Sequence, residues 1–437
     1  MRSVWDREVG GSNPLAPTNC FRQIESPAQR SLHFTSLNFK FFASRDSRNF
    51  DIRRERLHSI DALRGAAALA VVLYHTAGPK GQFEPLILRW IATPVLPVIR
   101  FGYAGVFLFF VISGFCIHLS RARAESQGRL PVGFKEFWKR RVRRLYPPYL
   151  VSLLLFLLIA GFTSKFEATF LYIWDVLLHL SMLHNLDSRT VYSINGVFWT
   201  LAIEEQLYLA YFLLLFMRKR WGWNRTLLIC LGARVAWFFV FTGLRTHLKI
   251  NIPIAEAAAS YWFNWALGAM SVEAIFGLTT LPWWCYKIQV AITTIVASIA
   301  LSMVTSLVQP NGTLFNTLWL IIHPLWGLAF FALLNWFVVA EKRWRQRVIP
   351  RLVRLLAGIG LFSYSLYLTH ELVALEEYRF AFLGLSPLLT AILLTTPASV
   401  VFAWLFFRVA EQPYLNSYKR RSLPAQIGPE ATATADA

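Results

Sequence analysis

The feature that most constrains this 437-residue chain is a series of apolar runs, each long enough to cross a lipid bilayer. Stretches such as 151–162 and 291–308 contain no charged residue and offer no polar face to water. Only 16% of the residues are charged, whereas soluble domains keep close to about a quarter. Within lipid, backbone N–H and C=O groups must pair inside their own segment, which favours helices. We therefore expect an all-α integral membrane protein whose first partner is the lipid bilayer.

Clusters of basic residues decide which apolar runs cross the membrane. They lie at 121–144, 218–225, 342–354 and 419–421, and such clusters beside spans are typical of cytoplasmic loops. If all four are cytoplasmic, the chain between 144 and 218 crosses twice, so the weaker run 168–184 is an outer-surface or re-entrant helix. We expect ten transmembrane helices, with both termini in the cytoplasm. The expected spans are 60–77, 98–119, 148–163, 197–216, 226–243, 258–277, 284–308, 314–340, 357–376 and 388–408.

The same distribution of basic residues accounts for the formal net charge of +20, so we expect no nucleic-acid partner. The four cysteines are scattered along the chain and predict neither a disulfide framework nor a zinc site. Residues 1–56 mix Arg, Ser, Asn and Pro with little periodicity, which indicates either a disordered tail or a start assigned too far upstream. We expect the membrane domain over 57–416 and a cytoplasmic C-terminal tail over 417–437.

Ionisable residues inside spans point to the interior of the helix bundle, because a charge that faces lipid is costly. The first span contains Asp61, Arg64 and His75. Arg64 and His75 are eleven residues apart, so they share a helix face and differ in height by about 16 Å. We expect Arg64 near the cytoplasmic end and His75 in the outer half. The alternatives are an Arg64 that snorkels to the interface and a His75 that only packs.

Two further groups of charged residues lie beside or within later spans. Arg141 and Arg144 face the same way on a helix and are either an anion clamp or a plain positive-inside anchor. Glu204 and Glu205 are adjacent inside an apolar run, so they cannot share one helix face. Glu204 lies at a depth where it can meet His75 and orient its ring. The alternative for the glutamates is polar contact between helices.

A polar stripe marks a later span, where Ser363, Tyr364, Tyr367 and His370 occur close together. Tyr367 and His370 are three residues apart and therefore share a helix face. We regard these four side chains as candidate site residues. The alternative is a set of structural hydrogen bonds between helices.

Taken together, these residues resemble a known family. Its marks are Asp61-Ala-Leu-Arg64-Gly65 with His75 ten intervening residues after Arg64, FFVISGF at 109–115, RVRRLYP at 141–147, FWTLAIEEQLY at 198–208 and SYSLYLTH at 363–370. From about 57 to 416 the chain is similar to the membrane-bound acyltransferase-3 family, whose members acylate bacterial O-antigen, exopolysaccharide, nodulation factors and macrolide sugars. The resemblance implies that Arg64, His75, Arg141 and Arg144 matter for activity.

The resemblance also implies an acyl-CoA donor, acetyl-CoA by default, with no permanently bound cofactor and no metal. In the bacterial cytoplasmic (inner) membrane, the enzyme would bind CoA near Arg64, Arg141 and Arg144 and extend the pantetheine arm towards His75. His75 would act as general base on a hydroxyl of a carbohydrate, such as a surface or extracellular polysaccharide, with Glu204 as orienter; transient acylation of His75 is the other route. The competing class is a multi-span transporter of a small anionic or acylated metabolite, which would often show internal repeats.

Overall fold

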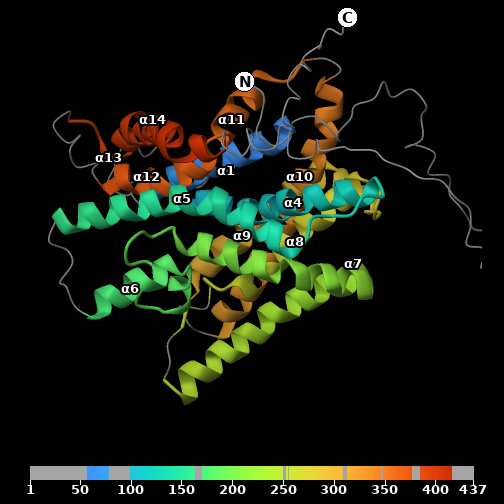
Figure 1. The fold of residues 1–437 in the computed structure, drawn as a ribbon, viewed down its shortest axis with the longest axis horizontal. Helices are drawn as coiled ribbons and strands as arrows, with labels where there is room; N and C mark the ends of the chain where they lie inside the picture. The colour runs from blue at the N-terminus through green and yellow to red at the C-terminus, as the bar shows by residue number, and fades with distance from the viewer. Residues whose placement is uncertain are drawn as a thin grey trace, which may run out of the picture. The chain divides into compact units, whose positions relative to one another are not determined.

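The computed structural model describes residues 57–77, 99–162, 170–249, 252–253, 255–308, 313–345, 348–375 and 384–415. Within these ranges every regular element is a helix, as Figure 1 shows. All of the described residues belong to one unit, Leu57–Ser417. The predicted tails over 1–56 and 417–437 lie outside the described residues.

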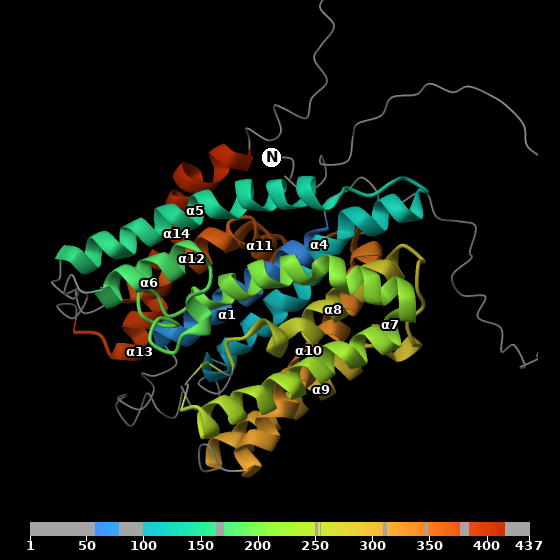
Figure 2. The same cartoon turned by 60° about the horizontal axis from the view of Figure 1, so that its bottom comes forward.

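The longer helices are α1 (His58–Ala77), α4 (Gly105–Ser126), α5 (Phe134–Phe162), α6 (Phe170–Leu180), α7 (Trp199–His247), α8 (Ala258–Ile275), α9 (Ile288–Leu307), α10 (Thr313–Arg345), α11 (Arg351–Gly360), α12 (Ser363–Leu375) and α14 (Thr396–Phe406). Shorter turns join or extend them, namely η2 (Phe101–Ala104), η3 (His184–Leu186), η4 (Trp283–Tyr286), α13 (Pro387–Thr390), η6 (Ala391–Thr395) and η7 (Phe407–Glu411). Figure 2 shows α7 and α9 on one side of the bundle, α5 and α14 on the other, and α1, α4 and α8 between them.

Six of the described helices are long and apolar enough to cross a membrane, and the bent pair α11 and α12 makes a seventh if it counts as one span. The expected all-helical membrane protein is thereby confirmed, while ten crossings and cytoplasmic termini remain predictions. The short helix α6 has only 11 residues. At 1.5 Å per residue it is roughly half as long as the hydrocarbon core is thick, so it does not cross alone.

Helix α7 consists of two helical arms that cover 226–243 and all but the first two residues of 197–216, both expected spans. The two arms are separated at Gly222, whose φ of 76° and ψ of 173° are not helical. A left-handed φ of this kind suits glycine, which has no Cβ to clash. The four basic residues of 218–225 surround the turn, so the apolar arms share a basic tip.

The centre of the bundle is packed through glycines that let helix backbones touch. A Cβ at Gly114 of α4 would lie 1.9 Å from the carbonyl oxygen of Trp265 in α8. A Cβ at Gly268 of α8 would lie 1.8 Å from the carbonyl oxygen of Val111 in α4. Small residues that allow such close approach are typical of helix interfaces in membranes. Helices α4 and α8 therefore form a rigid central pair.

The first turn of α1 is fixed by a carboxylate from the far end of α10. Glu341 accepts hydrogen bonds from the backbone N–H groups of His58 and Ser59, each at 2.9 Å, and from the Ser59 hydroxyl. Arg345 donates to the same carboxylate at 2.7 Å. An anion at a helix N-terminus satisfies unpaired N–H groups and complements the helix dipole. The start of α1 is therefore held at the basic end of α10, and His75 lies at the opposite end of α1.

A buried arginine donates hydrogen bonds to carbonyl groups of α10 near a proline inside that helix. Pro324 has no N–H, so the carbonyl of Leu320 loses its helical partner. Arg234 of α7 donates to this carbonyl at 3.2 Å and to the carbonyl of Trp319 at 2.7 Å. Its guanidinium also stacks over the Trp319 ring, at 4.0 Å from the centroid. Arg234 thus joins the second arm of α7 to the part of α10 around Pro324.

We expect Gly268→Val to destabilise the protein, because its side chain would overlap the backbone of α4. Overpacking of a core site costs about 1–3 kcal/mol or more, which should lower the Tm of the detergent-solubilised protein. The matched control is Gly232→Val in α7, where nothing lies within 4 Å of the added Cβ. Equal Tm values for the two variants would contradict the close α4–α8 contact.

Candidate active site

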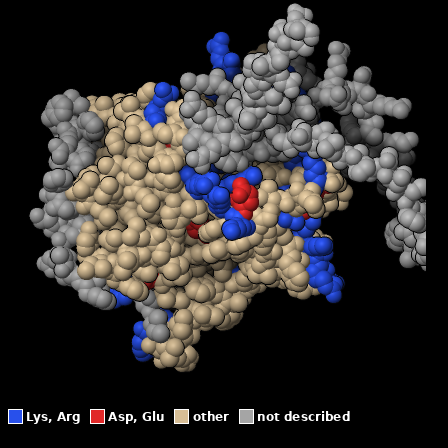
Figure 3. Space-filling model, viewed as in Figure 1, with Lys and Arg blue, Asp and Glu red and all other residues tan. Residues whose placement is uncertain are grey.

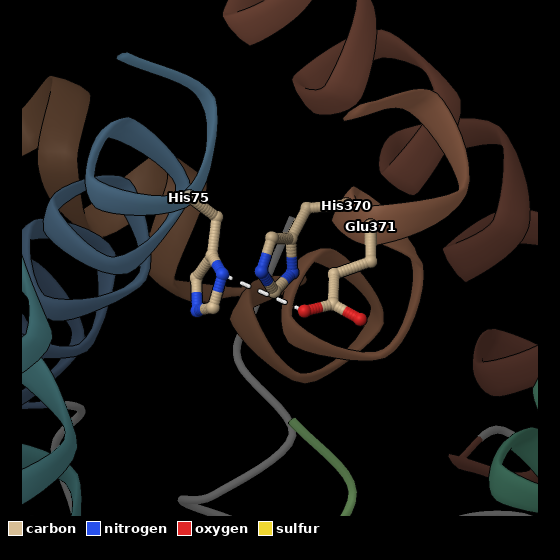
Figure 4. A group of neighbouring side chains, drawn as sticks. All are labelled: His75, His370 and Glu371. Carbon is tan, nitrogen blue, oxygen red and sulfur yellow. Dashed lines mark ion pairs between the residues drawn. The ribbon is translucent and has the colours of Figure 1, made fainter. Parts of the chain in front are cut away.

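Two helices bring together the side chains of His75, His370 and Glu371 (Figure 4). His75 lies near the end of α1, and the other two residues lie on α12. The Nδ1 atom of His75 is 3.5 Å from Oε1 of Glu371, and the two imidazole centroids are 5.2 Å apart. The other oxygen of Glu371 accepts a hydrogen bond of 2.8 Å from the backbone N–H of Gly196, shortly before α7.

The two histidines differ in exposure and in their hydrogen bonds. His370 is 0% exposed, and its Nδ1 lies 3.1 Å and 3.0 Å from the carbonyl oxygens of Leu366 and Tyr367. Because carbonyls only accept, Nδ1 of His370 carries the proton and Nε2 carries the lone pair. That Nε2 atom is buried and has no hydrogen-bond partner. The side chain of His75 is 28% exposed, so a substrate can reach it more easily than His370.

Aromatic side chains surround this centre. Tyr74 packs edge-on against the ring of His75, with the ring centroids 5.1 Å apart. The ring of Tyr103 in turn packs against that of Tyr74, with centroids 5.7 Å apart. Tyr367 stands beside His370 at 5.9 Å, and its hydroxyl is hydrogen-bonded to Thr200 of α7 at 2.8 Å. The polar groups therefore sit in a largely aromatic setting at the end of α1.

The carboxylate beside His75 is Glu371, whereas the sequence had led us to expect Glu204. Glu204 accepts hydrogen bonds from Ser113 at 2.5 Å and from Tyr208, so it serves the α4–α7 contact. In this structure Glu204 therefore does not lie beside His75, and its catalytic role stays a prediction. Glu371 directly follows His370 in the sequence and was overlooked, although an acid at the end of an apolar span was a signal for it.

The predicted arginines do come together. Arg64, Arg141 and Arg144 all lie within electrostatic range of the Cys116 thiol in α4, and so does Asp61. Three different helices, α1, α5 and α4, supply these residues. Arg64 and His75 share α1, and this arginine group is therefore separated from the histidine centre by the expected rise of about 16 Å. The anion-binding role of the arginines stays a prediction.

The remaining predicted residues fall into two kinds. Ser363 donates to the backbone carbonyl of Gly360 at 3.0 Å, and Tyr364 donates to that of Leu145 at 2.9 Å. These contacts agree with the alternative that both side chains form structural hydrogen bonds. Glu205 is different, because it is 6% exposed and neither of its carboxylate oxygens has a hydrogen-bond partner. Its role stays a prediction.

A buried polar network that sequence reasoning missed lies at the basic end. His118 of α4 contacts the hydroxyl of Tyr211 at 2.9 Å and donates to Glu273 of α8 at 2.8 Å. Glu273 also accepts from Trp223 at 2.7 Å and pairs with Arg218 at 2.7 Å. The network ties α4, the turn of α7 and α8 together.

Lys and Arg side chains also gather around acidic groups near the middle of the face drawn in Figure 3.

A second pair of histidines consists of His179 in the last turn of α6 and His184 in η3. The rings of His179 and His184 are stacked, with centroids 3.9 Å apart and planes 7° from parallel. Asp175 lies 3.0 Å from Nδ1 of His179 and accepts a hydrogen bond from Ser193 at 2.8 Å. Burial and the neighbouring His179 lower the pKa of His184 to about 3. This group anchors the loop that supplies the Gly196 N–H.

A model of the acyltransferase domain matches residues 57–408, so the chain belongs to the acyltransferase-3 family and is an acyltransferase. The family expected from the motifs is thereby confirmed. Among similar proteins is the peptidoglycan O-acetyltransferase OatA of Listeria monocytogenes serovar 1/2a, 31% identical over 191 residues, which are 40% of this chain and 27% of that protein. The O-acetyltransferase OatA of Staphylococcus aureus is 29% identical over 183 residues, 38% of this chain and 26% of that protein.

A putative acetyltransferase of Acidianus two-tailed virus is 29% identical over 168 residues, 38% of this chain and 44% of that protein. The chain thus spans roughly a quarter of the length of the two bacterial relatives and less than half of the viral one. No solved structure matches the chain significantly. All three relatives are named as acetyltransferases. The family match assigns the chain to the acyltransferases and not to the transporters that were the competing class.

We expect Glu371→Gln to lower acyl transfer by about 100-fold, the lower range of a general-base contribution. The amide keeps the shape of the side chain but removes the negative charge that orients His75. Transfer is measured as acylated product in membranes with matched amounts of inserted protein. Glu204→Gln is the comparison, because Glu204 does not contact His75. A severe loss in Glu204→Gln with full activity in Glu371→Gln would restore the original assignment.

The buried His184 predicts a loss of stability on acidification. The unfolded chain binds a proton at His184 below about pH 6.5, whereas the folded chain does so only near its lowered pKa, so stability falls as pH drops between these values. We expect the Tm of the solubilised protein to fall between about pH 6.5 and about pH 4, and to fall less in His184→Phe. Identical pH profiles for the two proteins would contradict this prediction.

Proposed function

We propose that this acyltransferase moves an acetyl group from acetyl-CoA, bound at the basic end of the bundle, to a hydroxyl of a carbohydrate at the opposite end. The observation that carries the proposal is the pairing of a partly exposed His75 with the carboxylate of Glu371. This pair lies at the end of α1 opposite to the Glu341 cap and the basic residues of α10. The acetyl group is supported by the names of the relatives.

The geometry suits general-base catalysis by His75. Glu371 faces Nδ1 of His75, which favours the tautomer with its proton on Nδ1 and a lone pair on Nε2. Nε2 then takes the proton of the acceptor hydroxyl while the oxygen attacks the thioester carbonyl carbon. As the C–S bond breaks, the imidazolium returns the proton to the leaving thiolate. The 3.5 Å separation is loose for such a pair, and catalytic contacts often tighten only when substrate binds.

The donor end of the proposal rests on the three arginines around Cys116. Guanidinium groups bind phosphates through charge-assisted hydrogen bonds, and CoA carries phosphates at its nucleotide end. The Nε atom of Arg141 is buried and has no hydrogen-bond partner, so it can donate to a ligand. The flexible pantetheine arm would span the rise of about 16 Å along α1. No cofactor would stay bound after CoA leaves.

The acceptor and the membrane follow from the same arrangement. We place the basic end in the cytoplasm by the positive-inside rule, in a bacterial inner membrane crossed ten times with both termini inside. His75 then opens to the outer side, where surface or extracellular polysaccharide is the acceptor. Two relatives bear the name O-acetyltransferase, one of them for peptidoglycan, which supports a glycan hydroxyl.

We expect membranes that contain the protein to release thiol from acetyl-CoA when a crude glycan extract is present. His75→Ala should reduce this release by about 100-fold or more, because it removes the base. The matched control is His247→Ala, which changes an exposed histidine at the end of α7. Full activity of inserted His75→Ala would overturn the base assignment. Transfer from another thioester but not from acetyl-CoA would overturn the donor assignment and keep the acyltransferase.

A further inference from the structure

Three features of the histidine centre are also those expected of a metal site. The first is the distance of 3.5 Å between Nδ1 of His75 and Oε1 of Glu371. A charge-assisted N–H···O hydrogen bond is shorter, about 2.7–2.9 Å. In a tetrahedral zinc site with bonds of about 2.0–2.2 Å, neighbouring ligand atoms are roughly 3.3–3.6 Å apart. The observed separation therefore matches two ligands on one metal ion better than a direct hydrogen bond.

The second feature is the buried lone pair of His370. Its Nε2 atom is enclosed, with no hydrogen-bond partner, in a side chain that is 0% exposed. A buried acceptor without a partner costs free energy, so such a group needs a ligand or a functional reason. One ligand atom each from His75, His370 and Glu371 lies within 4.8 Å of the others. Small side-chain movements would bring all three onto one ion.

The third feature is the support behind these ligands. A histidine that binds a metal usually donates its other ring N–H to a carbonyl or carboxylate, which fixes the tautomer. His370 does so through Nδ1, towards the carbonyls of Leu366 and Tyr367. A carboxylate ligand is usually hydrogen-bonded as well, and Glu371 accepts from the Gly196 N–H through the oxygen that points away from His75.

We propose that Nδ1 of His75, Nε2 of His370 and a carboxylate oxygen of Glu371 bind a divalent transition-metal ion of the zinc class. Two imidazoles and one carboxylate are a ligand set that suits Zn²⁺, and three protein ligands leave a fourth position open. The partial exposure of His75 and Glu371 places this open position on the accessible side. From the sequence we had expected no metal, because direct attack of a hydroxyl on the thioester needs none.

If His75 is the general base of the proposed function, metal binding should affect acyl transfer, and this expectation rests on that function. A neutral imidazole has one lone pair, so a metal on Nδ1 of His75 leaves Nε2 as an N–H donor without basicity. The metal-loaded protein should therefore transfer acyl groups more slowly than the metal-free protein. The ion would act as a reversible inhibitor at the catalytic base.

Metal binding can be measured without any assay of transfer. Untagged full-length protein is purified in detergent, treated with a chelator, desalted and titrated with Co²⁺ as a spectroscopic substitute for Zn²⁺. We expect one Co²⁺ per chain, with the visible absorption of a four-coordinate ion that Zn²⁺ abolishes. His75→Ala, His370→Ala and Glu371→Gln should each weaken binding by at least tenfold. The control His247→Gln, at an exposed histidine, should bind like the wild type.

A second measurement uses only the wild-type protein, in case a variant fails to fold. Zn²⁺ should protect His75 from acylation by diethyl pyrocarbonate, read by mass spectrometry, and leave the exposed His247 reactive. Absence of one-to-one binding, or binding that survives all three substitutions, would overturn the site. If the metal binds as proposed but transfer is unchanged, the metal site stands and the general-base role of His75 is wrong.

Discussion

The position of the histidine centre depends on the direct contact between the backbones of α1 and α11. A Cβ at Gly65 would lie 2.0 Å from the carbonyl oxygen of Leu356, and one at Gly360 would lie 1.9 Å from that of Asp61. Helix α12 begins directly after this contact, at a bend of 75° from α11. The closeness of two backbones, which only glycine allows, therefore sets the distance between the end of α1 and the residues of α12.

The apolar runs predicted the helices well, because length and hydropathy alone decide whether a segment suits lipid. The three predicted arginines also lie within electrostatic range of one thiol, that of Cys116. The partner of His75 could not be predicted in the same way. Depth along a helix does not reveal which helix lies beside α1, and Glu204 faces α4 through Ser113. The α1–α11 contact and the direct packing of α12 on α1 together bring Glu371 to His75.

Buried polar groups in this bundle serve two different purposes. Some are fully paired, such as Arg234, which replaces the N–H that Pro324 lacks, and His118, which joins three helices. Others keep a free atom, such as Nε2 of His370 and the carboxylate of Glu205. Paired groups hold the helices together. A free buried atom does not mark a site by itself, because His179 and His184 also keep unpaired ring nitrogens. At His370 the neighbouring side chains of His75 and Glu371 are what point to a site.

Gly196 gives the centre an unusual kind of sensitivity. Its N–H holds Glu371, and no ordinary side-chain replacement other than proline removes a backbone N–H. Yet an added Cβ at residue 196 would stand 2.9 Å from the Oε1 atom that faces His75. Even alanine would press on the carboxylate while leaving its hydrogen bond in place. One methyl group in this loop would therefore change the spacing between Glu371 and His75 without replacing either side chain.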